Sequence, residues 1–176
     1  MIPYFREINL HDEDSASLNI EYYGEKSGDI NTAIINLPHL SNFTDFESLK
    51  SEPDVSITYI NQVEQLGDSD LIIIPGTKNT TSDLQYLKET GLAARIKKRY
   101  NQGIPVIGIC GGYQMMGQQL IETRKNESRV KESRGLGILP VKTKFFSNKH
   151  TYQIQGKIRS KGRLMQGLQE ETITGY

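Results

Sequence analysis

The stretch Pro105-Val106-Ile107-Gly108-Ile109-Cys110-Gly111-Gly112-Tyr113-Gln114 decides the fold. Its apolar run ends at Cys110, the only cysteine of the chain, and two glycines follow. Glycine tolerates the backbone angles of a sharp turn from a strand into a helix. A helix that begins here brings free N–H groups and its positive dipole end close to the thiol, and both favour the thiolate. A small buried cysteine in a glycine-rich loop is the plainer interpretation, but the stretch favours a nucleophile at a strand-to-helix turn.

Composition excludes several classes of function. The chain has 176 residues, 36% of them hydrophobic, and 21 basic residues balance 21 acidic ones. A net charge of zero argues against a nucleic-acid partner, whose binding depends on neutralising phosphates. No run approaches the roughly 20 apolar residues of a membrane span, so we expect no membrane association. The N-terminus has no signal-peptide pattern, and a single cysteine forms no internal disulfide, so we expect a cytoplasmic protein.

Strand and helix signals alternate along most of the chain. Apolar, β-branched runs predict strands at residues 32–37, 55–60, 70–74 and 106–109. Helices are expected after a cap at Ser41 or Thr44, from a cap among residues 80–82 to Gly91, over residues 92–100, and from Gly111. This alternation predicts an α/β fold, a mostly parallel sheet with helices on both faces.

The remaining segments suggest the domain organisation. Residues 1–29 are polar and acidic, and we interpret them as a linker or as the tail of a preceding domain. Residues 30–176 are expected to form one domain. Within it, residues 122–133 are charged and predict a mobile loop, residues 135–141 predict a strand, and residues 152–158 predict an antiparallel edge strand.

A site is expected where two glycine-containing turns meet. Pro75-Gly76 and Cys110-Gly111 each follow a predicted strand, and ligands of parallel sheets bind beyond the carboxyl ends of the strands. Acyl transfer at a thiolate needs N–H donors for the oxyanion, and Gly111 and Gly76 can supply them. It also needs a base. His39 is the best internal candidate because it follows the first strand, whereas His11 lies in the linker and His150 in a polar stretch.

The turn resembles that of the class I, or triad-type, glutamine amidotransferases. Their pattern Gly-x-Cys-x-Gly-x-Gln is matched by Gly108, Cys110, Gly112 and Gln114. Residues 37–46 (LPHLSNFTDF), residues 75–80 (PGTKNT) and residues 3–15 are further similar to the cobyric acid synthase family. The resemblance covers nearly the whole chain. It implies a flavodoxin-like amidotransferase fold.

The resemblance also implies a reaction. Cys110 would release ammonia from glutamine through a cysteinyl thioester, Gly76 and Gly111 would form the oxyanion hole, and Gln114 would contact the bound glutamine. The ammonia would amidate carboxylates of a corrinoid, adenosylcobyrinic acid a,c-diamide, in cobalamin synthesis. ATP and Mg²⁺ would act on a separate synthetase domain, and no cofactor or metal is expected in this one.

The sequence departs from the family pattern in two ways. It contains no Gly-x-x-x-x-Gly-Lys-[Ser/Thr] phosphate loop, and no Tyr-Glu-x-His motif, which carries the family's catalytic histidine. We therefore expect a fragment that lacks the synthetase domain and the catalytic histidine, with the base beyond Tyr176 and little activity alone. The alternatives are the amidotransferase subunit of another ligase, such as one that amidates the glutamate of lipid II, a non-enzymatic module of this fold, and a cysteine hydrolase of a related type.

Overall fold

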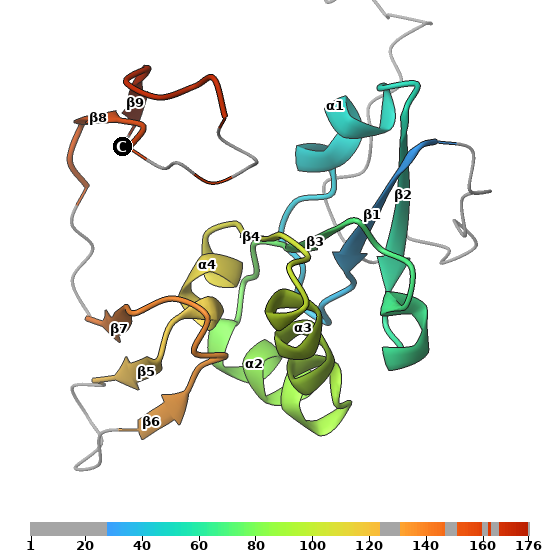
Figure 1. Ribbon diagram of the computed structural model, residues 1–176. Helices are drawn as coiled ribbons and strands as arrows, with labels where there is room; N and C mark the ends of the chain where they lie inside the picture. Colours follow the sequence, from blue (N-terminus) through green and yellow to red (C-terminus); the bar gives the residue numbers. More distant parts are fainter. Residues whose placement is uncertain (1–27, 124–130, 147–150, 160–161, 163–165, 176) are drawn as a thin grey trace, which may run out of the picture.

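A four-stranded parallel sheet forms the centre of the computed structural model, which describes residues 28–123, 131–146, 151–159, 162 and 166–175 (Figure 1). Its strands lie in the order β2-β1-β3-β4. Their bounds are Ile30–Ile35 for β1, Val55–Ile60 for β2, Leu71–Ile74 for β3 and Val106–Gly108 for β4. Every neighbouring pair is parallel, so the carboxyl ends of all four strands meet at one edge. The predicted α/β class and its four central strands are confirmed.

The two faces of the sheet bury alternate residues of the same strands. Ile34 and Ile73 pack with Phe46 on one face. Their neighbours Ile35 and Ile74 belong to the larger apolar core on the other face. This period of two is that of a strand covered on both sides. Each buried Ile or Leu contributes about 1.5–3 kcal/mol to folding, so the alternation fixes the register of every strand.

Helices cover both faces, as predicted (Figure 1). The short 3-10 helix η2 (Thr44–Phe46) and helix α1 (Glu47–Lys50) supply the smaller face. The larger face takes η3 (Val63–Leu66), α2 (Thr80–Glu89), α3 (Leu92–Asn101) and α4 (Gly111–Met116). Gly91 separates α2 from α3 with a φ of +78°, a backbone conformation that suits glycine.

The cap predicted for the first helix, at Ser41 or Thr44, is wrong. No side chain caps η2 or α1, whose N-cap residues are Phe43 and Phe46. Ser41 instead donates its backbone N–H to the carbonyl of Gly76, at 3.1 Å. The cap of α2 lies one residue earlier than predicted, at Asn79, whose side chain accepts the N–H of Ser82.

The C-terminal part differs most from expectation. Strands β5 (Gln119–Glu122), β6 (Lys131–Arg134) and β7 (Lys142–Phe145) form a small second sheet in the order β6-β5-β7. The predicted mobile loop at 122–133 is therefore wrong at both ends, because β6 pairs antiparallel with β5; residues 124–130 between them lie outside the described residues. The edge strand predicted at 152–158 is present as β8 (Ile154–Lys157), which pairs antiparallel with β9 (Thr172–Gly175).

The strand predicted at residues 135–141 does not form. The N–H groups of Leu136 and Ile138 donate to the carbonyls of Met115 and Met116, at 2.8 and 2.9 Å. Those two carbonyls lie in the last turn of α4, where backbone carbonyls have no partner within the helix. The segment thus closes the C-terminal end of α4 instead of joining a sheet.

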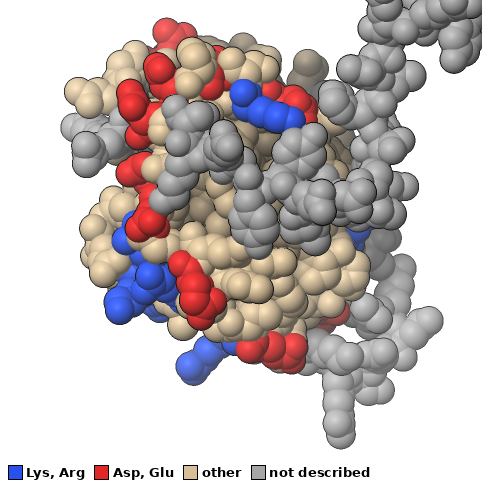
Figure 2. Space-filling model, turned by 90° about the vertical axis from the view of Figure 1, so that its right-hand side faces the viewer, with Lys and Arg blue, Asp and Glu red and all other residues tan. Residues whose placement is uncertain are grey.

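On the described part of the face in Figure 2, Lys and Arg side chains form small groups among uncharged and acidic residues, and no continuous basic surface is present there. This distribution fits the balanced composition. Within the described ranges, no helix is both long and apolar enough to cross a membrane.

Candidate active site

Cys110 occupies a strained turn between β4 and α4. It is the N-cap residue of α4, with φ +48° and ψ −108°, and one of only two described non-glycine residues with positive φ. Such a conformation costs about 1–3 kcal/mol and persists only where the surrounding structure imposes it. The cysteine is exposed, and among the described residues its thiol has no hydrogen-bond partner. A strained, exposed thiol at the first turn of a helix is presented to solvent instead of buried in the core.

The glycine at position 112 explains how the turn becomes so tight. A Cβ atom there would lie 1.9 Å from the carbonyl oxygen of Ile74, the last residue of β3. Real Cβ atoms do not approach backbone so closely, so only glycine permits α4 to begin directly against the adjacent strand. The match to Gly-x-Cys-x-Gly is therefore a packing requirement of the turn.

The loop after β3 runs beside the cysteine, as the sequence predicts. A Cβ atom placed on Gly76 would lie 3.8 Å from the Cβ of Cys110, and one on Gly111 would lie 3.3 Å from the backbone nitrogen of Thr77. No described residue accepts a hydrogen bond from the N–H of Gly76 or Gly111. The backbones of Gly76 and Gly111 thus both lie near Cys110, and their N–H groups are left without a partner among the described residues.

The loop after β3, residues 75–80, is called the glycine loop. A second loop, residues 37–41, holds it in place. Leu40 and Thr77 form an isolated antiparallel bridge. It is flanked by hydrogen bonds from Ser41 N to Gly76 O, at 3.1 Å, and from Lys78 N to His39 O, at 2.9 Å. A Cβ on Gly76 would also meet the hydroxyl of Ser41 at 2.9 Å. The segments LPHLSNF and PGTKNT, quoted separately from the sequence, are thus one structural unit.

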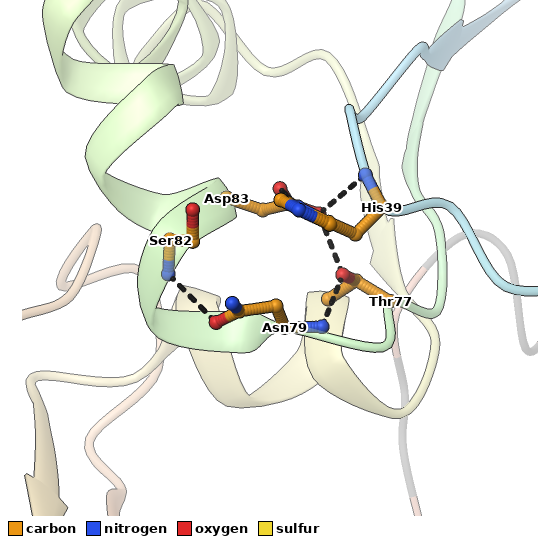
Figure 3. Close-up of polar contacts among 5 residues, drawn as sticks. All are labelled: His39, Thr77, Asn79, Ser82 and Asp83. Carbon is orange, nitrogen blue, oxygen red and sulfur yellow. Dashed lines mark hydrogen bonds and ion pairs between the residues drawn. The ribbon is translucent and has the colours of Figure 1, made fainter.

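Asp83 links the loop at residues 37–41 to the glycine loop. Its side chain is fully buried in the first turn of α2. One carboxylate oxygen lies 2.6 Å from the ring Nδ1 of His39, and the other accepts from the hydroxyl of Thr77 at 2.5 Å (Figure 3). That second oxygen also accepts the backbone N–H of His39, at 3.3 Å. Burial, and then the charge of Asp83, raise the pKa of Tyr86 on the same helix. Sequence reasoning missed Asp83.

Of the three histidines in the sequence, the structure describes His39. His39 lies on the loop that contacts the glycine loop, and its side chain is 45% exposed. It has the buried carboxylate partner of a catalytic histidine, but no hydrogen bond joins it to Cys110. His11 and His150 lie outside the described residues, as does Tyr176.

Gln114 lies one helical turn after Cys110, and its N–H donates to the carbonyl of Cys110 at 3.1 Å. Its side-chain oxygen accepts from the hydroxyl of Thr80 at 3.2 Å, which links α4 to the start of α2. This contact fixes the side chain beside the glycine loop. Among the described residues, no group of three or more His, Cys, Asp or Glu side chains is placed to hold a metal ion.

A parallel sheet, a strained cysteine after β4 and a glycine loop after β3 define a class of α/β domains with an elbow, a sharp strand-to-helix turn that carries an exposed cysteine. Comparison with known proteins narrows the class. Residues 31–176 match the family model described as the CobB/CobQ-like glutamine amidotransferase domain, so the chain belongs to that family.

Curated relatives and a solved structure agree with this assignment. The chain is 42% identical over its whole length to a cobyric acid synthase of Desulfitobacterium hafniense, and 45% identical over its whole length to one of Pelotomaculum thermopropionicum. It spans only 35% and 33% of those two proteins. A solved structure titled as a glutamine amidotransferase matches 72% of this chain and 62% of its own, at 17% identity and a TM-score of 0.52, and so supports the fold.

Proposed function

We propose that this chain is the glutaminase part of a cobyric acid synthase, in which Cys110 attacks the side-chain amide of glutamine. The observation that carries the proposal is the strained, exposed Cys110 next to the unpaired N–H groups of Gly76 and Gly111. Identity of 42–45% to curated cobyric acid synthases supports the choice among ligases.

The proposed chemistry is acyl transfer. The Cys110 sulfur forms a bond to the amide carbon, and the negative charge on the oxygen is stabilised by the N–H groups of Gly76 and Gly111. The C–N bond then breaks, the nitrogen takes a proton, and ammonia leaves. Water hydrolyses the thioester and releases glutamate. Gln114 is proposed to contact the bound glutamine from α4.

The rest of the reaction is proposed for other parts of the whole protein. A base in a Tyr-Glu-x-His motif, which these 176 residues do not contain, would take the thiol proton and return it to the leaving nitrogen. ATP and Mg²⁺ would activate the corrinoid carboxylates on a synthetase domain, and the ammonia would amidate them. The reduced thiol that the mechanism needs is compatible with the cytoplasm.

Labelling of the thiol tests the proposal directly in this chain. A glutamine analogue with a chloroketone in place of the side-chain amide should alkylate Cys110 saturably, and glutamine should protect it. Mass spectrometry identifies the modified residue. A simple chloroketone without the amino-acid group is the matched control and should react more slowly. Equal rates for the two reagents, or no protection by glutamine, would contradict a glutamine site.

Turnover in the whole protein gives the second readout. Cys110→Ser should lower ammonia release from glutamine by more than about a thousandfold, because a serine hydroxyl is a far weaker nucleophile than a thiolate. Its circular dichroism spectrum should match that of the wild type. Retained ammonia release in Cys110→Ser would end the assignment of Cys110 as the nucleophile.

A further inference from the structure

We infer that Asp83 is a positioning residue for glutamine hydrolysis: it fixes the glycine loop, and through it the N–H of Gly76, relative to Cys110. The inference rests on the proposed function. Asp83 contacts neither the Cys110 thiol nor the N–H groups of Gly76 and Gly111. It acts through Thr77, the residue that follows Gly76 in the loop.

The buried carboxylate is the common point of the two loops. It accepts from the Thr77 hydroxyl and from the His39 backbone, and it contacts the His39 ring. The Thr77 oxygen in turn accepts the N–H of Asn79, at 3.0 Å (Figure 3). The N–H of Asp83 donates to the carbonyl of Asn79, also at 3.0 Å. Residues 77–83 are therefore tied into one closed set of hydrogen bonds.

The burial of Asp83 makes this arrangement costly to disturb. A carboxylate taken out of water is stable only with its hydrogen-bond partners in place. Loss of one partner would leave part of the buried charge of Asp83 without a hydrogen bond, so the partners are held in a single geometry. Thr77 cannot rotate away from Asp83 without that cost, and Gly76 precedes Thr77 directly.

The position of the loop matters because the oxyanion donors act only at short range. A donor stabilises the oxyanion when it lies about 2.7–3.1 Å from it, and the loss of one donor lowers kcat about 100- to 1000-fold. We expect a loop released from Asp83 to leave that range. The donor interacts more strongly with the oxyanion than with the neutral amide oxygen of bound glutamine, so kcat should fall more than KM rises.

The experiment measures ammonia release from glutamine in the whole protein. Asp83→Asn and Thr77→Val should each lower kcat at least tenfold while KM stays within about threefold. Thr77→Ser keeps the hydroxyl and should restore most of the kcat that Thr77→Val loses. Gln85→Ala, an exposed change two residues from Asp83 on the same helix, is the matched control and should behave as wild type.

The variants separate this role from other ones. A Thr77→Val protein with wild-type kcat would overturn the inference, and this variant decides the matter if Asp83→Asn does not fold. A loss in His39→Ala as large as in Asp83→Asn would also overturn it, since Asp83 would then orient a catalytic histidine. Undiminished turnover in Cys110→Ser would refute the proposed function instead, and the inference would fall with it.

Discussion

At the scale of single residues, His39 is the described histidine nearest in the fold to the loop beside Cys110, and its contacts decide its role. His39 has a buried carboxylate on its Nδ1, as a catalytic base does, but it makes no hydrogen bond to the thiol among the described residues. The hydrogen bonds of His39 give it a structural role without catalysis, because its ring and its backbone N–H both bind the buried carboxylate of Asp83. We therefore expect His39 to stabilise the loops.

Replacement of His39 by alanine tests this view. A general base is worth about 100- to 10,000-fold in rate, so His39→Ala in the whole protein should keep kcat within about tenfold of wild type if His39 is not the base. The free energy of unfolding should fall by about 1–3 kcal/mol, because Asp83 loses one hydrogen bond. Ammonia release and denaturant titration measure the two effects. A hundredfold loss of kcat in a folded protein would return the base to His39.

At the scale of elements, the central strands and the turn at Cys110 were predicted from local sequence, whereas the parts that distant contacts determine were not. Residues 55–60 form β2 as predicted, because β-branched residues at alternating positions favour a strand by themselves. The turn at Cys110 was also predicted, because the glycines that the turn requires lie next to the cysteine in the sequence. The pairing of Asp83 with His39 joins residues 44 positions apart, and no local pattern reveals it.

Two errors have the same cause. The apolar segment 135–141 has the composition of a strand, but its N–H groups donate to the free carbonyls at the end of α4 instead of to a neighbouring strand. Residues 131–133 look like a solvated loop, but β5 offers an edge, and pairing with it outweighs their poor strand propensity. In both cases the hydrogen-bond partner comes from elsewhere in the fold.

The cap of α2 is the element-scale feature that we expect to matter for the site. The Asn79 side chain accepts the N–H of Ser82, at 3.2 Å, and holds the first turn that carries Asp83. Asn79→Ala should lower the free energy of unfolding by about 0.5–2 kcal/mol, as the loss of an N-cap does. Asn79→Asp keeps the cap and is the control. Urea denaturation of both variants checks this, and equal stability of Asn79→Ala and wild type would show that the cap contributes nothing.

At the scale of the whole molecule, the chain spans about a third of the length of the curated relatives named above. Its described residues bring together the elbow cysteine, two N–H donors and the network that holds them, and the proposed base lies outside these 176 residues. A thiol with its donors but no base can still react with a strong electrophile. It should hydrolyse an amide poorly, because the leaving nitrogen needs a proton.

Two measurements on two proteins therefore separate the parts of the site. The 176-residue chain should react with the chloroketone analogue at Cys110, yet release ammonia from glutamine at least about 100-fold more slowly than the whole protein, the factor that a general base supplies. Both rates are measured at equal protein concentration, with Cys110→Ser as the blank. Equal ammonia release by the two proteins would mean that the base lies within residues 1–176, with His39 as the first residue to replace. Failure of both reactions in the short chain, with normal turnover in the whole protein, would show that the elbow and its glycine loop need the rest of the protein to reach their active geometry.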